Sequence, residues 1–134
     1  MKQVFKVGDA KEFVTTVKKD DIAAFESGTV HAVYSTFALA RDAEWSGRLF
    51  VLEMKDADEE GIGTHIEINH LSPAFVGDEV KFISKFEGIS DRKEIITSFE
   101  AFVGSRLIAQ GKQAQKILNQ DKLNTIFVSL NTDN

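Results

Sequence analysis

The stretch VHAVYSTFALARDAEWSGRLFVLEM, residues 30–54, decides the fold, because its apolar residues have the spacing of one long helix. Thr29 precedes it and predicts an N-cap. One stripe of this helix carries no charge and many small side chains: Ala32, Thr36, Leu39, Ala40, Ala43, Gly47, Phe50 and Met54. A second stripe is also largely apolar: Val30, Tyr34, Phe37, Trp45, Leu49 and Leu52. Apolar residues on two faces predict a helix that other elements mostly enclose.

Alternating segments on both sides of this helix predict the strands that enclose it. Residues 11–18 alternate before the helix, and residues 20–27 predict a short helix or turn. Four alternating segments follow the helix, at 61–71, 80–87, 94–103 and 106–118. Between the last two, Gly104 and Ser105 suit a two-residue hairpin, and Gly111 predicts a bulge or bend. One antiparallel sheet wrapped around one long helix is an α+β layout, the hot-dog arrangement.

This arrangement predicts one domain that pairs with a second copy. Pro73 is the one proline of the 134 residues and no Gly/Ser-rich linker occurs, so we expect a single domain over 1–134. A sheet of this kind has exposed edges and leaves the helix incompletely covered. We therefore expect a homodimer, in which a second copy covers both, and a tetramer is the alternative. The acidic stretch 53–61 predicts the clearest loop, and 119–134 is an uncertain C-terminal tail, open to a short helix.

Composition narrows the class of protein. Hydrophobic residues make up 43% and charged residues 28% of the chain, which excludes full disorder. No apolar run approaches the ~20 residues that cross a bilayer, and the N-terminus lacks the apolar segment of a secretory signal. A formal net charge of −5 argues against non-specific binding to nucleic acid or to an anionic membrane. There is no cysteine, hence no thiol nucleophile or thiolate metal site, and we expect a cytoplasmic location.

His70 is the most informative single residue. Strand alternation places it on the face of Ile66 and Ile68, at the end of its strand, whereas His65 points to the other face. An imidazole at the wet end of an apolar face can have a pKa that moves across neutrality, which suits catalysis. The alternative is a core histidine that hydrogen-bonds a backbone carbonyl. Because the two histidines point apart, they do not predict a shared metal site.

Thr36 and Glu44 lie on the long helix and also have two readings. Glu44 stands between Arg41 and Arg48, so it is either part of a surface row of ion pairs or a carboxylate that activates water. Thr36 either returns its hydroxyl to a carbonyl one turn back or contacts a substrate. In a continuous helix their Cα atoms are about 12 Å apart. Either the helix starts late, or the two residues act from opposite sides of a substrate or from different subunits.

The combined spacing of these residues resembles that of a known family, the fluoroacetyl-CoA thioesterase-like group of hot-dog proteins. The resemblance covers about residues 30–118. The sequence Val33-Tyr34-Ser35-Thr36, with Glu44-Trp45 eight residues later, matches the family's Thr and Glu-Trp placement. Gly63-Thr64 followed by His70 matches its Gly-Thr and His placement. The resemblance implies the hot-dog fold, a dimer and an acyl-CoA thioesterase.

The resemblance also implies a set of site residues. It places the catalytic trio at Thr36, Glu44 and His70, and substrate contacts at Gly63 and Thr64. Hydrolysis of an acyl-CoA gives a carboxylic acid and coenzyme A, with no cofactor or metal beyond the coenzyme A of the substrate. Glu44 or His70 would activate the nucleophile, which is water, Thr36 or Glu44 itself. Thr36 would hydrogen-bond the carbonyl or the nucleophile, and the Gly63 amide would stabilise the oxyanion.

Two residues differ from the family pattern, and two other functions are alternatives to an acyl-CoA thioesterase. Val30 stands near the family's aromatic gate and Gln115 near an arginine, which argues against fluoroacetyl-CoA as the substrate. A non-catalytic dimeric module that binds acyl-CoA or another apolar ligand is the main alternative. A hydratase or dehydratase is disfavoured, because no Asp-x-x-x-x-His pair opens a helix.

Overall fold

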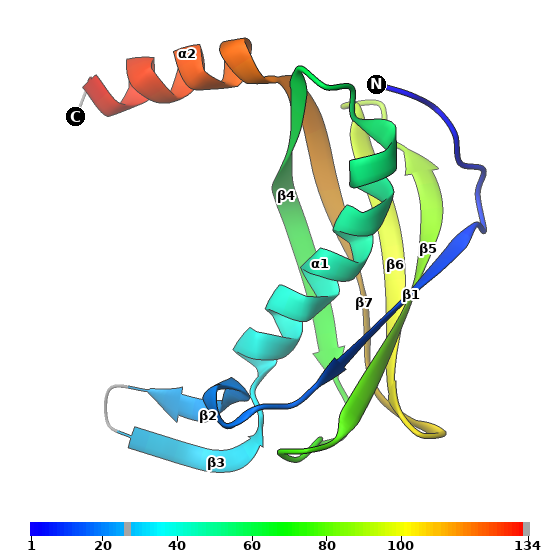
Figure 1. Ribbon diagram of the computed structural model, residues 1–134, viewed down its shortest axis with the longest axis vertical. Helices are drawn as coiled ribbons and strands as arrows, with labels where there is room; N and C mark the ends of the chain where they lie inside the picture. Colours follow the sequence, from blue (N-terminus) through cyan, green and yellow to red (C-terminus); the bar gives the residue numbers. More distant parts are fainter. Residues whose placement is uncertain (26–27, 133–134) are drawn as a thin grey trace.

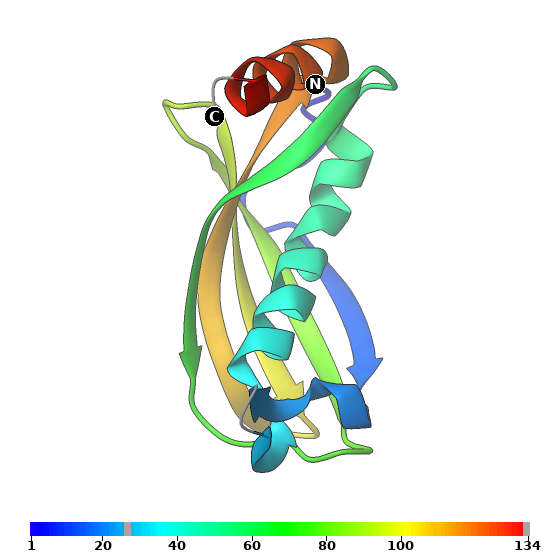
Figure 2. The ribbon, with the colours of Figure 1, turned by 90° about the vertical axis from the view of Figure 1, so that its left-hand side faces the viewer.

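The structure, a computed structural model that describes residues 1–25 and 28–132, has one antiparallel sheet curved around one helix. The sheet has five strands in the order β1-β5-β6-β7-β4. Their bounds are Ala10–Thr16 (β1), Glu59–His70 (β4), Glu79–Ile89 (β5), Glu94–Val103 (β6) and Arg106–Asn119 (β7). Helix α1, Thr36–Met54, lies across the concave face of the sheet (Figures 1 and 2). The α+β prediction and the five alternating strands are confirmed.

The start of the long helix differs from the prediction. Residues Gly28–Tyr34 form strand β3, which pairs with β2, Ile22–Phe25, after a short 3-10 helix at Lys19–Asp21. Ser35, not Thr29, is the N-cap, and its hydroxyl accepts a hydrogen bond from the Ala38 N–H at 2.9 Å. The β-branched and aromatic residues before Ser35 favour a strand, so the helix begins later than the periodicity indicated.

The predicted short helix or turn at 20–27 is therefore mostly strand. The 3-10 helix accounts for its beginning and β2 for its middle, while Glu26 and Ser27 lie outside the described residues. The side chain of Val30, the position near the family's aromatic gate, also lies outside what the structure describes. The predicted loop at 53–61 shrinks to residues 55–58, because α1 extends to Met54 and β4 begins at Glu59.

Helix α1 buries most of one stripe and leaves much of the other at the surface. Leu39, Ala43 and Phe50 of the uncharged stripe are fully buried against the sheet, which forms the core. On the second stripe, Phe37 is 84% exposed and Trp45 42% exposed. Within the described residues the chain therefore encloses the first stripe more fully than the second, which fits the expected incompletely covered helix. Burial of a large apolar side chain is worth about 1.5–3 kcal/mol, so these exposed side chains favour a further contact.

A β-bulge at Thr64 changes which residues of β4 face the helix. Gly63 pairs with Gln115 and His65 with Ala114, which leaves Thr64 as the extra residue. A Cβ on Gly63 would overlap the Glu44 carboxylate, so Gly63 faces α1. His70, seven positions later, also faces α1. Strict alternation would put residues seven positions apart on opposite faces, and the bulge instead puts Gly63 and His70 on the same face.

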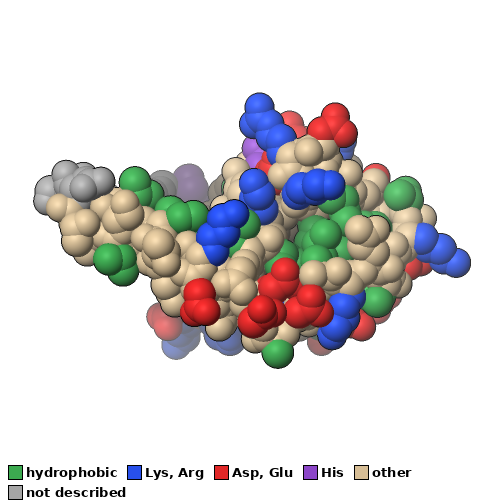
Figure 3. Space-filling model, turned by 90° about the horizontal axis from the view of Figure 1, so that it is seen from above, with side chains coloured by type: hydrophobic (Ala, Val, Ile, Leu, Met, Phe, Trp, Pro, Cys, Tyr) green, Lys and Arg blue, Asp and Glu red, His purple; other side chains and the backbone are tan. Residues whose placement is uncertain are grey.

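The C-terminal tail forms helix α2, Gln120–Thr132, instead of an irregular end. Figures 1 and 3 show that α2 projects from the end of β7, away from the sheet and α1, with hydrophobic side chains along its surface. Of its described residues, Leu123 alone is buried. None of the helices within residues 1–25 and 28–132 is both long and apolar enough to cross a membrane.

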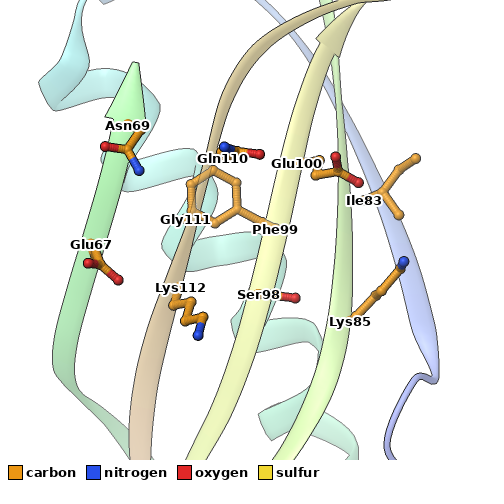
Figure 4. Close-up of a pocket in the computed structure, with 10 residues that line it drawn as sticks. All are labelled: Glu67, Asn69, Ile83, Lys85, Ser98, Phe99, Glu100, Gln110, Gly111 and Lys112. Atoms are coloured by element: carbon orange, nitrogen blue, oxygen red, sulfur yellow. The ribbon is translucent and has the colours of Figure 1, made fainter. Parts of the chain in front are cut away.

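The convex face of the sheet carries a shallow polar groove of about 320 Å³ (Figure 4). Gly111, one of its lining residues, pairs in register with both Phe99 and Ile68. A Cβ on Gly111 would overlap the Glu67 carbonyl oxygen and come within 2.9 Å of the Phe99 ring. Gly111 therefore permits a close approach of strands. The register shift between β6 and β7 lies between Ala101 and Phe102, so of the predicted bulge or bend at Gly111 the bulge is wrong.

Candidate active site

Thr36 and His70 form a hydrogen-bonded pair where α1 begins and β4 ends. The Thr36 Oγ1 and His70 Nδ1 atoms are 2.9 Å apart. Thr36 is the first residue of α1, so the late start of the helix turns its hydroxyl toward β4 rather than toward a preceding helical carbonyl. The hydroxyl donates to Nδ1 or accepts from it, depending on the tautomer of the imidazole.

The second ring nitrogen of His70 is available for chemistry. His70 Nε2 is buried and has no hydrogen-bond partner among the described residues. Burial of the ring lowers the pKa of His70 below its ordinary value of 6.5, and an interaction with the Ser72 backbone opposes this in part. The imidazole is therefore neutral at pH 7. A neutral ring with one bonded and one unbonded nitrogen can accept or donate a proton at Nε2.

A partly buried ionic network holds the turn that carries Thr36. The Tyr34 hydroxyl donates to the Asp42 carboxylate at 2.5 Å, and Arg41 donates to both Asp42 and Asp21 at 3.0–3.1 Å. The Ser35 N–H donates to the Asp21 carbonyl at 2.8 Å. Burial disfavours the Asp21 carboxylate, but the Lys18 N–H and Arg41 outweigh it and hold the pKa of Asp21 below its ordinary value. The network thus fixes both sides of the β3–α1 junction.

Glu44 lies two turns further along α1 and pairs with a different part of β4. Its carboxylate fills the space next to Gly63 where a larger residue would carry a Cβ. Glu44 and Gly63 line a cavity of about 290 Å³ together with Thr64, His65 and Ile66. The Thr64 hydroxyl donates to Glu94 at 2.5 Å, so of the two predicted substrate-contact residues Gly63 is the one that faces Glu44.

Two buried glutamines of β7 hold the backbone of α1 next to Glu44. Gln113 donates to the Ala43 carbonyl at 2.5 Å, and Gln115 donates to Gln113 at 2.9 Å and to the Glu44 carbonyl at 3.4 Å. From the sequence, Gln115 stands out only as a departure from the family, and Gln113 does not stand out at all. Polar residues at inward-facing positions of an alternating strand were the available signal, because buried polar groups need partners.

The structure thus brings the predicted residues together as two pairs, Thr36–His70 and Glu44–Gly63. No hydrogen bond joins Glu44 to His70 among the described residues. Gly63 and His70 are up to about 23 Å apart along an extended strand. Next to Thr36 lies a largely apolar cavity of about 780 Å³, lined in part by Ile22, Ala23 and Phe37, large enough for an acyl chain.

Comparisons with protein families and with solved structures find proteins that are similar to this chain. The family model described as fluoroacetyl-CoA-specific thioesterase matches residues 17–121. A thioesterase superfamily member from Thermus thermophilus has a similar structure with a TM-score of 0.92 and 29% identity, over 98% of this chain and 96% of that chain.

More distant structures share the fold. A variant of the fluoroacetyl-CoA-specific thioesterase FlK has a TM-score of 0.85 at 17% identity, over 96% of this chain and 98% of its own. A hot-dog-like protein from Thermanaerovibrio acidaminovorans has a TM-score of 0.84 at 20% identity, over 93% of this chain and 92% of its own. No curated protein matches the sequence. The hot-dog prediction is confirmed.

Proposed function

This chain belongs to the fluoroacetyl-CoA-specific thioesterase family, and we propose that it is an acyl-CoA thioesterase, which hydrolyses an acyl-CoA to a carboxylic acid and coenzyme A. The observation that carries the proposal is the Thr36–His70 pair, in which one imidazole nitrogen is bonded and the other is buried without a partner among the described residues. The proposal includes a cytoplasmic location and no cofactor beyond the coenzyme A of the substrate.

The proposed active unit is a homodimer joined through β4. This strand has 12 residues, stands at the edge of the sheet, and carries Ile66, which is 43% exposed. An unpaired edge of this length is a template for a second strand. A two-fold axis between Ile66 and Glu67 would pair the strands antiparallel and set Gly63 opposite His70 of the partner subunit. Each site would then combine Glu44 and Gly63 of one subunit with Thr36 and His70 of the other.

In the proposed reaction, water adds to the thioester carbonyl carbon while His70 Nε2 or Glu44 takes its proton. Thr36 orients the imidazole through Nδ1. The developing oxyanion is stabilised by the Gly63 amide, a type of contact worth a few kcal/mol. The tetrahedral intermediate then collapses, the carbon–sulfur bond breaks, and the coenzyme A thiolate takes up a proton from the protonated base. A covalent route through Glu44 would form an anhydride instead of using water directly.

The test is release of free thiol from short, branched, aromatic and long acyl-CoAs. His70→Ala and Glu44→Gln should each lower kcat by at least about tenfold, because each removes a group that transfers a proton. Asn69→Ala and Glu53→Gln are the matched controls: Asn69 points to the convex face (Figure 4) and Glu53 lies at the far end of α1 paired with Lys11. Both controls should keep wild-type rates.

Two outcomes would contradict the proposal. Equal rates in wild type, His70→Ala and Glu44→Gln, with circular dichroism unchanged, would reject the assigned roles. Tight binding of acyl-CoA with no turnover by the wild type across the whole panel would identify a non-catalytic binding module.

A further inference from the structure

Helix α2 presents an apolar stripe that the rest of the chain covers only at its start. Leu123, Ile126 and Phe127 follow the i, i+3, i+4 spacing of one helix face. Leu123 is buried against the body, whereas Ile126 is 39% and Phe127 49% exposed. Residues 123–132 carry no charged side chain. An exposed, uncharged stripe that continues a buried one favours a partner surface.

The direction of α2 shows where that surface lies. Figures 1 and 2 show that α2 and the β2–β3 hairpin both project past the free edge of β4, at opposite ends of this strand. A two-fold axis that pairs β4 with its copy exchanges these two ends. The α2 helix of one subunit is then carried over the partner's β3–α1 junction and the loop that follows the partner's β4.

That end of the molecule carries its own exposed apolar side chains. Phe37 opens α1 next to Thr36, and Leu71 follows His70 directly. Phe75 is 50% exposed and forms an isolated bridge with Val33 of β3. In a two-fold dimer, the apolar stripe of α2 from one subunit meets the apolar side chains at the β3–α1 end of the other subunit. The symmetry makes this contact occur two times in each dimer.

We propose that α2 of each subunit packs on this end of its partner, along Phe37, Leu71 and Phe75, and closes the apolar side of the partner's acyl site next to Thr36 and His70. This inference rests on the proposed β4 dimer. It makes Ile126 and Phe127 determinants of acyl-chain binding in the other subunit. A second copy fits better than an anionic membrane, because the chain has a net charge of −5 and α2 has one basic residue, Lys122.

Sedimentation of the full-length protein tests the contact. Phe127→Asp should raise the dimer dissociation constant by at least about tenfold, because it places a charge in two symmetry-related apolar contacts. Val128→Asp is the matched control: it adds the same charge one residue later, on the other side of α2, and should change the constant by less than about twofold. Phe127→Asp should also raise KM for long acyl-CoAs more than for acetyl-CoA.

Cross-linking tests whether α2 of one subunit lies next to Phe75 of the other. The sequence has no cysteine, so the introduced thiols are the only ones that can react. In the double variant Phe127→Cys/Phe75→Cys, the two thiols of one chain lie beyond opposite ends of β4, more than about 30 Å apart. A short bis-maleimide should therefore give covalent dimers and no internal loop. The control Phe127→Cys/Lys85→Cys, with Lys85 on the convex face, should give few.

The outcomes separate this inference from the proposed function. A dimer whose dissociation constant is the same with Phe127→Asp, and whose cross-linking equals the Lys85 control, overturns the α2 contact and leaves the β4 dimer standing. A wild-type monomer at micromolar concentration overturns both, while thiol release still reports on hydrolysis. Binding to phosphatidylcholine vesicles that depends on Phe127, without an effect on the dimer, would also overturn the inference.

Discussion

At the scale of the residue, the asymmetry of the His70 ring determines how the site should respond to pH. Thr36 forms a hydrogen bond with Nδ1, while Nε2 is buried and has no hydrogen-bond partner among the described residues. Burial lowers the pKa of His70 and so favours the neutral ring. A base works near neutral pH only while it is unprotonated. A lowered histidine pKa therefore extends activity toward acid.

We expect the acid limb of the kcat/KM profile to have its midpoint below pH 6.5, the ordinary value for histidine. The reason is that burial lowers the pKa of His70 in the folded protein. The measurement is a pH–rate profile of thiol release between about pH 4.5 and 9, with an acyl-CoA that the enzyme turns over well. A midpoint clearly above 6.5 would contradict a buried neutral imidazole.

The same shift has a consequence for stability with a defined sign. Between pH 6.5 and the lower folded pKa, the unfolded chain binds a proton at His70 that the folded chain does not. The free energy of unfolding should therefore fall as the pH drops through this window. His70→Gln lacks the titrating group, so its stability should fall less over the same range; parallel urea titrations of both proteins check this.

At the scale of the element, periodicity predicted most strands and missed the places where backbone geometry departs from it. Residues 80–87 and 94–103 alternate without interruption, and β5 and β6 follow them closely. Nothing in Gly63-Thr64-His65 announces the bulge, because a bulge depends on how β7 pairs alongside. The false start of α1 has a similar cause: Tyr34 donates its N–H to Ala74, a contact distant in sequence.

Of the candidate site, family spacing predicted Thr36, Glu44 and His70, but not the residues that hold them in place. Asp21 and Asp42 meet through Arg41 only after the 3-10 helix and α1 are packed. Gln113 reaches Ala43 from 70 residues away. Side-chain networks that join distant segments leave no local pattern, so they had to come from the structure.

Gly111→Ala tests the close approach of β7 to its neighbours. We expect a loss of about 2 kcal/mol or more in the free energy of unfolding, because the new Cβ has no room between the Glu67 carbonyl and the Phe99 ring. Gly104→Asn is the control: its space is open and its φ of +59° is one that Asn tolerates, so its cost should stay below about 1 kcal/mol. Equal losses in urea unfolding would contradict the close-approach explanation.

At the scale of the whole molecule, the sequence predicted a helix covered on two sides, and the described chain covers one. Phe37 and Trp45 remain at the surface, and β4 forms one edge of the sheet. A hydrophobic pattern in the sequence predicts that a side chain is buried, but it does not separate burial within one chain from burial at a subunit interface. The dimer prediction is the physical counterpart of this uncovered stripe.

Mixed dimers test whether the two pairs of site residues come from different subunits. His70→Ala and Glu44→Gln should each keep about a tenth of wild-type activity or less alone, yet a refolded equimolar mixture should recover about a quarter of it. Half of the dimers are then mixed, and each has one site with an intact Glu44 and an intact partner His70. No recovery, with mixed dimers shown by mass spectrometry, would place both groups of a site in one subunit.

The strand that carries Gly63 and His70 is also the free edge of the sheet, and this double use ties turnover to abundance. If each active site needs residues from two subunits, the protein is largely monomeric and inactive at low concentration. Its total activity then rises more steeply than its concentration. Dilution then lowers the activity of each chain, and synthesis of more protein raises it, without any other regulator.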